Sequence, residues 1–304
     1  MKIKLTLQLT VLLALSLGFE VHAVDRVTGS YKQSEQINEV LTFSDNSPGQ
    51  TVRIFNVYGA VDVAGHASDE IIITATNQVH AESQAAVNEG LDEIGLAITE
   101  HQGTLYIYLD SPFTHFDPVV GELWHSDTCW KRDDCSRQHA KKAYQYRMDI
   151  MVSVPDTVNL EVSAINDGDI TITGVEAESL KVSNINGAID MVDVAGKTYV
   201  NAINQDINLV YSKNPDKDSE FESINGDLNI TFAGQPNAEV VYETMHGDLY
   251  TRFDVKALEP QVLLTSQQKE HGIKYQLGAA SRLQLGSGGP VYQFKTLNGD
   301  IKIK

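Results

Sequence analysis

Cysteine and tryptophan are scarce in this sequence, with two of each among 304 residues, and there are only eight prolines. Two cysteines cannot build a scaffold of several disulfides, so a chain of this length must rely on a hydrophobic core. Basic residues are also few: 23 Lys and Arg stand against 41 Asp and Glu, which gives a net charge of −18. We therefore expect no nucleic-acid partner and no anionic lipid surface, because both are bound through clustered Lys and Arg.

Long apolar runs are absent after the first 23 residues. Those residues begin with Lys2 and Lys4, continue with an apolar run and end in Val-His-Ala, with small residues at the recognition positions of a signal peptidase. This pattern predicts a signal peptide over residues 1–23 and no transmembrane segment after its cleavage. An uncleaved anchor is the alternative, but the run is short for a spanning helix, which needs about 20 residues. The mature protein is expected in the periplasm or at the cell surface.

Helical periodicity over long stretches is also missing, so the core is expected to consist of strands. From Val158 onward the sequence returns six times to one phrase, of which Phe221–Ile230 (FESINGDLNI) is typical. Its central aliphatic residue recurs in steps of 20, 18, 21, 21 and 52 residues, at Ile165, Ile185, Ile203, Ile224, Met245 and Leu297. The long last step has room for one degenerate copy around Val262 to Leu285.

Three further apolar columns appear when the copies are aligned. They consist of Val162, Val182, Val200, Phe221, Tyr242 and Phe294; of Ile170, Ile189, Ile207, Leu228, Leu249 and Ile301; and of Ile172, Met191, Leu209, Ile230, Thr251 and Ile303. A spacing of two within a strand places side chains on one face, and polar residues such as Lys181, Asp190, Asn208 and Asn229 fall on the other. This alternation predicts half-buried strands.

The fold class predicted from these repeats is all-β: a β-solenoid, or β-helix-like stack, of roughly 20-residue repeats with one irregular inserted loop. About 20 residues can form one flattened coil, and stacked coils share one core. A sandwich built from separate hairpins is the alternative. Asn-Gly-Asp or a variant marks each turn, where glycine accepts a positive φ, so Gly226→Val is predicted to cost roughly 1 kcal/mol or more.

Three regions follow the signal peptide. Residues 24–110 form a looser β region, in which Val52–Val63 resembles a repeat phrase, residues 81–94 read as a short helix or loop, and Ile94–Leu109 reads as a hairpin. Residues 111–143 break the pattern and read as an inserted loop, and residues 144–304 form the repeat region.

The inserted loop contains His125, Cys129, Cys135 and His139, whose side chains are of the types that bind zinc. Their spacing fits no common zinc motif, and export places the thiols in an oxidising compartment. A Cys129–Cys135 disulfide is therefore the favoured prediction, with a metal site or free thiols as alternatives. We expect no cofactor.

Aromatic and basic residues also gather in this loop, which makes it a candidate recognition loop. The residues concerned are Trp124, Trp130, Arg132 and Arg137. Alternatively, the tryptophans fold back and cover the flank of the solenoid.

Catalytic signatures are weak. Outward acids recur with the repeat, at Asp169, Asp190, Asp206, Asp227 and Asp248, and stacked coils bring such carboxylates near each other without any catalytic purpose. The same turns could offer oxygen to calcium, but each copy supplies one Asp only. We find no Gly-x-Ser-x-Gly elbow, no phosphate loop and no His-Glu-x-x-His motif.

The stretch MVSVPDTVNLEVSAINDGDITITGV, residues 151–175, resembles the bacterial putative-adhesin family of β-strand-repeat proteins, a domain of unknown function. The copies ESINGDLNI and TLNGDIKIK and the glycine cluster at 286–289 match it too. The resemblance covers residues 50–110 loosely and 145–304 well. It implies a right-handed β-solenoid-like fold and export to the cell envelope, and it brings no catalytic residues.

The function predicted from the sequence is that of a non-enzymatic, exported cell-envelope protein, a binding or structural module. Its partner is expected to be an envelope protein or a glycan. The alternative is a carbohydrate-active enzyme, a polysaccharide lyase or hydrolase, on a β-helix scaffold.

Overall fold

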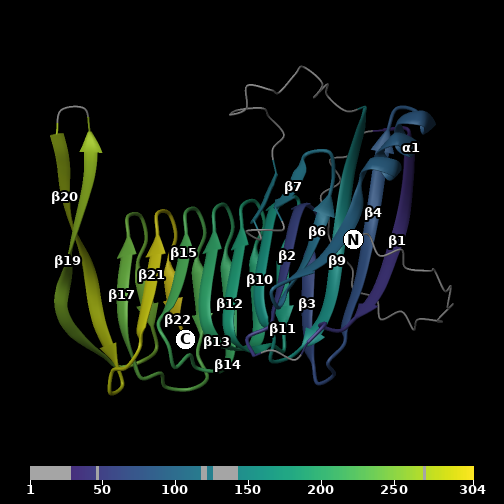
Figure 1. The fold of residues 1–304 in the computed structure, drawn as a ribbon. Coiled ribbons are helices and arrows are strands. Elements are labelled where there is room, and N and C mark those ends of the chain that lie inside the picture. Colours follow the sequence, from purple (N-terminus) through teal and green to yellow (C-terminus); the bar gives the residue numbers. More distant parts are fainter. Residues whose placement is uncertain (1–28, 46–47, 118–121, 126–142, 270–271) are drawn as a thin grey trace.

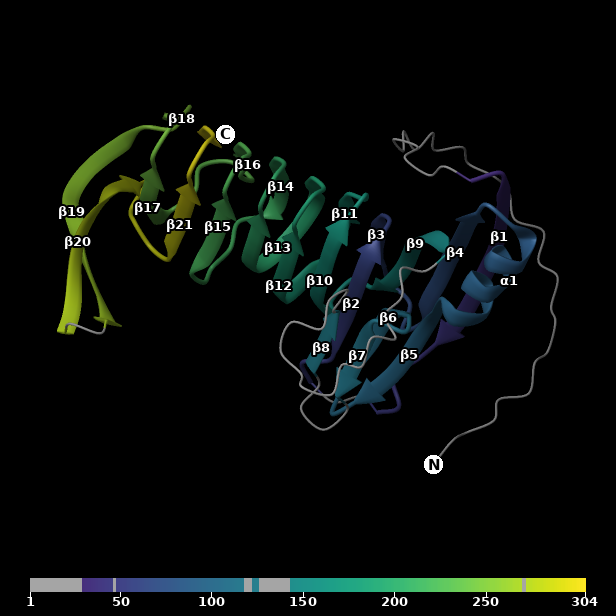
Figure 2. The same ribbon diagram turned by 90° about the horizontal axis from the view of Figure 1, so that it is seen from above.

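The computed structural model describes residues 29–45, 48–117, 122–125, 143–269 and 272–304 (Figure 1). The predicted signal peptide therefore lies outside the described residues. Apart from one short helix, the regular elements of the described chain are strands, and most of them form a curved stack (Figure 2). No helix of the described part has the length and apolar character needed to cross a bilayer.

Each repeat folds as a rung, in which one strand leads through a sharp turn into a second. The first strands form row A, in the spatial order β6 (Thr104–Asp110), β2 (Thr51–Tyr58), β10 (Asn159–Asn166), β12 (Glu176–Asn184), the second half of β13 (Ile189–Ala202), β15 (Ser219–Ser223), β21 (Val291–Thr296) and β17 (Ala238–Thr244). The second strands form row B, in the order β9 (Tyr144–Pro155), β3 (Val61–His66), β11 (Ile170–Thr173), the first half of β13, β14 (Ile207–Lys213), β16 (Leu228–Thr231), β22 (Ile301–Ile303) and β18 (Leu249–Thr251). All of these pairings are parallel.

The predicted columns lie in register inside the stack. Val182 pairs with Val200, and Val200 pairs with Phe221, so the central residues of three copies lie on adjacent rungs. The residues of all three columns face the interior; most are fully buried, while Tyr242, Leu249 and Thr251, on the last rung, are half-buried. The prediction of one shared interior is confirmed, and the sandwich of separate hairpins is excluded.

The order of the rungs differs from the order of the repeats in the chain. The C-terminal pair β21–β22 lies between the pairs β15–β16 and β17–β18 (Figure 1). The prediction of a degenerate copy around Val262 to Leu285 is wrong. This segment belongs to β19 (Val255–Lys269) and β20 (Gly272–Leu285), which form an antiparallel hairpin, and β20 pairs with β17. This hairpin accounts for the step of 52 residues between Met245 and Leu297.

Antiparallel strands close the N-terminal end. In row B, β4 (Ile71–Ala81) pairs with β9, and β1 (Tyr31–Leu41) pairs with β4; in row A, β5 (Gly95–His101) forms the predicted hairpin with β6. The predicted short helix is α1 (Gln84–Glu93), which begins where the Ser83 side chain accepts a hydrogen bond from the Ala86 N–H.

Side chains at the corner between the rows form ladders from rung to rung. The Asn186 amide donates to Asn166, and the same bond recurs between the next copies, with N···O distances of 2.7–3.0 Å along Asn166, Asn186, Asn204, Asn225 and Asn298. The aliphatic residues on which the copies align lie beside this ladder, and Ile185, Ile224, Leu297 and Met245 point into solvent.

The turn glycine has a different role from the one expected. Gly226 does not have a positive φ, nor does Gly187, Gly247 or Gly299. A Cβ atom on Gly226 would instead lie 2.1 Å from the Gln205 carbonyl oxygen of the neighbouring rung. Glycine is needed here because the turns stack backbone against backbone.

Candidate functional site

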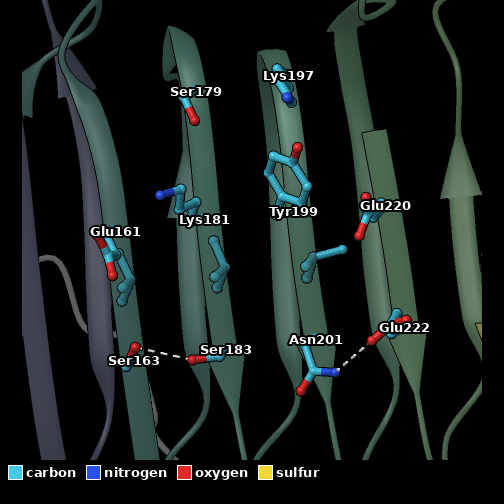
Figure 3. A pocket seen from close by; sticks show the side chains of 13 residues that line it. Glu161, Ser163, Ser179, Lys181, Ser183, Lys197, Tyr199, Asn201, Glu220 and Glu222 are labelled. Atoms are coloured by element: carbon cyan, nitrogen blue, oxygen red, sulfur yellow. Dashed lines mark hydrogen bonds between the residues drawn. The ribbon is translucent and has the colours of Figure 1, made fainter. Parts of the chain in front are cut away.

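The outer face of row A carries a groove lined mostly by polar side chains. This shallow groove of about 670 Å³ crosses β10, β12, β13 and β15, with Val162, Val182 and Val200 beneath it. Ten polar side chains define this outer groove: Glu161, Ser163, Ser179, Lys181, Ser183, Lys197, Tyr199, Asn201, Glu220 and Glu222. Figure 3 shows them projecting from four adjacent strands.

The groove follows from the pleat of the strands. Since alternate residues of each strand point outward, side chains from four copies lie next to one another in rows. One row runs from Glu161 through Lys181 and Tyr199 to Glu220, and the row beside it ends with Asn201 and Glu222. Neighbouring side chains therefore lie at the strand separation, roughly 4.8 Å.

Opposite charges and hydrogen bonds hold part of this surface in place. The Arg53 guanidinium lies 3.2 Å from a Glu161 carboxylate oxygen, and the Ser183 hydroxyl donates to Ser163 at 3.0 Å. The Asn201 amide donates to Glu222 at 3.5 Å (Figure 3). The groove therefore carries charges of both signs, with Lys181 and Lys197 among Glu161, Glu220 and Glu222.

Lys197 and Tyr199 lie on the same strand and interact. The ammonium nitrogen of Lys197 lies 4.6 Å from the centre of the Tyr199 ring. The interaction with the Tyr199 side chain raises the pKa of Lys197, so the groove carries a positive charge beside this ring.

The inserted loop contributes a two-stranded hairpin, β7 (Thr114–Asp117) and β8 (Glu122–His125), so this part of the insert is more regular than expected. Phe116 of β7 packs on Tyr106 and Tyr108 of β6, with ring centres 4.8 and 5.3 Å apart. Arg53 lies beside the same Tyr106 and also binds Glu161. The hairpin therefore lies on the outer face of row A, one strand away from the outer groove.

Most residues of the predicted recognition loop lie outside the described residues. Trp124 and His125 belong to the strand β8. Those that lie outside are Cys129, Trp130, Arg132, Cys135, Arg137 and His139. Among the described residues no group of three or more His, Cys, Asp or Glu is arranged to hold a metal ion. Phe116, which joins the insert to row A, was not singled out in the sequence.

The recurring aspartates have structural partners. A carboxylate oxygen on each of several rungs accepts the backbone N–H of the next rung, at 2.8–3.0 Å, as seen for Asp169, Asp206, Asp227 and Asp300. Asp190 accepts the Asn208 amide instead. Because these oxygens already stabilise the turns, turn chemistry explains the repeated Asn-Gly-Asp without calcium.

Removing the Lys302 ammonium should change how stability depends on pH. This ammonium lies 2.5 Å from Asp227, and its hydrogen bond lowers the pKa of that carboxyl. A lowered pKa stabilises the fold above the unfolded value of about 3.9, and this part is lost as the pH falls through the folded value. For Lys302→Met we expect a loss below about 1 kcal/mol at pH 7, since the pair is partly exposed. Urea midpoints at pH 7 and pH 3 check this; a loss of equal size at both would contradict it.

These features define a class of protein: a stacked β-repeat scaffold with an apolar interior and a polar outer groove. The chain belongs to the Toastrack DUF4097 family, whose model matches residues 144–304, more than half of the sequence. No curated protein matches it.

Solved structures with similarity to the chain are distant in sequence. One is a putative cell adhesion protein from Clostridium sporogenes, with 12% identity and a TM-score of 0.41, covering 89% of this chain and 99% of that one. Another is a putative lipid binding protein from Parabacteroides distasonis, with 11% identity and a TM-score of 0.30, covering 90% and 98%. A putative adhesin from Bacteroides fragilis has 11% identity and a TM-score of 0.29, covering 89% and 97%.

Proposed function

We propose that this protein is a non-enzymatic, exported binding module of the cell envelope, and that it holds its partner in the outer groove of row A. The observation that carries the proposal is the groove itself, in which ten polar side chains from four repeats share one solvent-facing surface. The N-terminal residues 1–23, with the pattern of a signal peptide, support export to the periplasm or cell surface.

The chemistry of the groove favours an uncharged, hydroxyl-rich ligand such as an envelope glycan. Its side chains offer hydroxyl, amide, carboxylate and ammonium groups next to one aromatic ring, that of Tyr199. Short polar groups repeated at roughly the strand spacing suit a ligand that is itself a chain of similar units. Since charges of both signs are present, we expect the groove to attract a strongly charged ligand only weakly.

We further propose that the inserted loop contributes to the same binding surface. Through Phe116 its hairpin packs on β6, one strand away from the groove. The roles proposed for Trp124, Trp130, Arg132 and Arg137 as recognition residues, and for a Cys129–Cys135 disulfide that stiffens the loop, belong to this extension.

Binding measurements on the mature chain, residues 24–304, test the proposal. The probes are immobilised neutral and amino-sugar polysaccharides, and we expect Tyr199→Ala to weaken binding about tenfold, a loss of about 1.4 kcal/mol. The matched control is Tyr250→Ala, which removes an exposed tyrosine from the outer face of row B. Equal binding by wild type and Tyr199→Ala, or equal losses in both variants, would exclude the groove.

A carbohydrate-active enzyme is the second candidate, because Glu161, Glu220 and Glu222 bring carboxylates into the same groove as Tyr199. A general acid at neutral pH needs a carboxyl shielded from water. The side chains of Glu161 and Glu222 are 31% and 39% exposed, and Glu220 is exposed, which favours binding over catalysis. Release of reducing ends by the wild type, lost in Glu222→Gln, would support the enzyme instead.

A further inference from the structure

Four of the described strands are edge strands of the sheet, and three of them are protected against pairing with another chain. The edge strand β18 has only three residues, and β19 contains Pro260 and a shift of register between Leu258 and Gln261. The edge strand β5 is half-buried at all seven positions, and its Glu100 accepts the Ser44 N–H. Short length, proline, irregularity, cover and charged side chains are the usual ways in which proteins block an open edge.

The fourth edge, β1, has only the last of these protections, in Lys32, Glu35 and Glu39. Its register with β4 runs unbroken over eleven residues, from Tyr31 opposite Ala81 to Leu41 opposite Ile71, and it contains no proline. Nine of its eleven residues are exposed, including Tyr31 at 46% and Val40 at 60%. Among the described strands only β4 pairs with it, and it is the last strand at this end of row B, beside α1 (Figures 1 and 2).

We infer that β1 pairs with β1 of a second copy, antiparallel and about a two-fold axis, so that row B continues from one molecule into the other. Edge strands offer a row of unpaired N–H and C=O groups, and a closed two-fold dimer satisfies both copies at once. In an antiparallel pair, residues directly opposite each other have side chains on the same side of the sheet. A two-fold axis perpendicular to the sheet must therefore pass midway between one residue and the same residue of the second copy.

The charges of β1 select one of the three central registers. Centring the pair on Gln36 places Lys32 opposite Val40, Gln33 opposite Glu39 and Glu35 opposite Ile37, with no like charges facing each other. Centring it on Glu35 would oppose Glu35 to its own mate, and centring it on Ile37 would oppose Glu35 to Glu39. Like charges directly opposite destabilise a strand pair, so the Gln36 register is favoured even though the whole chain is acidic.

The same register covers the apolar side chains that the single molecule leaves exposed. Tyr31 lies opposite Leu41 of the second copy, and an aromatic side chain opposite an aliphatic one is a stabilising cross-strand pair. Val40 lies opposite Lys32, whose aliphatic stem packs over apolar surface while the ammonium stays in water. The dimer therefore gives both exposed residues a partner.

Sedimentation of the mature chain over a concentration series tests the dimer. We expect reversible dimers, and we expect the triple variant Ser34→Lys, Gln36→Lys, Asn38→Lys to raise the dissociation constant at least tenfold, because it opposes lysines across the axis. A second triple variant with Glu at these positions should also fail to pair with itself, whereas a mixture of the two should form heterodimers. A chain that is monomeric throughout, or a Lys variant that dimerises like the wild type, would overturn the inference.

Cysteine cross-linking tests the register. Gln36→Cys places two thiols at the axis, within the Cα separation that a disulfide needs, and should give a covalent dimer under mild oxidation. The control Lys32→Cys is also at an exposed position but lies opposite Val40, so it should cross-link no more than the wild type. A covalent dimer in the control but not in Gln36→Cys would reject this register. The outcome does not depend on whether the outer groove binds a glycan.

Discussion

Replacing Phe294 with alanine is expected to destabilise the protein by about 3–5 kcal/mol, while Tyr242→Ala should cost clearly less. Phe294 is fully buried and stacks on Phe221, with ring centres 4.7 Å apart. Tyr242 occupies the same column on the last rung, where it is half-buried. Urea unfolding of the two variants and the wild type measures both losses.

This ranking tests the order of the rungs. If the repeats stacked in chain order, Tyr242 would lie on Phe221 and Phe294 would be at the end, so Tyr242→Ala would be the more costly change.

Engineered disulfides give an independent check of the order of the rungs. Glu222→Cys with Lys295→Cys joins neighbouring strands and should cross-link, whereas Glu222→Cys with Glu243→Cys spans two rungs, roughly 9.6 Å, beyond the reach of a disulfide.

The position of the C-terminal rung has a consequence for folding. The β17–β18 rung precedes it in the chain but has no parallel neighbour other than β21–β22 among the described strands. Until residues 291–303 are available, the growing stack therefore ends at β15–β16. Closing the stack requires a contact across the whole β19–β20 hairpin, and such long-range contacts are slow to form.

The sequence predicted the interior well because burial leaves a period of two in every copy. Val182, Val200 and Phe221 could be placed on adjacent rungs from that period alone. The order of the last two rungs could not be predicted in this way, because all copies carry the same phrase and each fits on any other. The step of 52 residues was the one signal that the regular succession is interrupted.

The outer groove was harder to foresee, because its residues come from four copies and none forms a motif. A signal nevertheless existed in the alignment. The turn positions hardly vary between copies, whereas the outward position of the first strand changes from Glu161 to Lys181, Tyr199 and Glu220. Variation confined to one column of a repeat points to a surface whose side chains are not fixed by stacking.

Adding a single methyl group at Gly226 is expected to cost about 3 kcal/mol or more. The Cβ atom of Gly226→Ala would lie 2.1 Å from the Gln205 carbonyl oxygen and 2.4 Å from its carbon, so backbone and not a flexible side chain must move. A shift of one turn is passed on to the next, because Gly299 stacks on Gly226 with the same close approach. Thermal and urea unfolding of the variant measure the loss.

Gly226→Asn distinguishes this explanation from the need for a positive φ. Asparagine tolerates a positive φ better than alanine does, so it would recover stability if the turn required that conformation. Because Gly226 has no positive φ, we expect Asn to be at least as damaging as Ala. The matched control is Gly95→Ala, since a Cβ there meets nothing within 4 Å and should change stability by less than about 0.5 kcal/mol. A Gly226→Ala protein as stable as this control would show that the turns are able to separate, and the tight stacking of the corner would then not hold the rungs together.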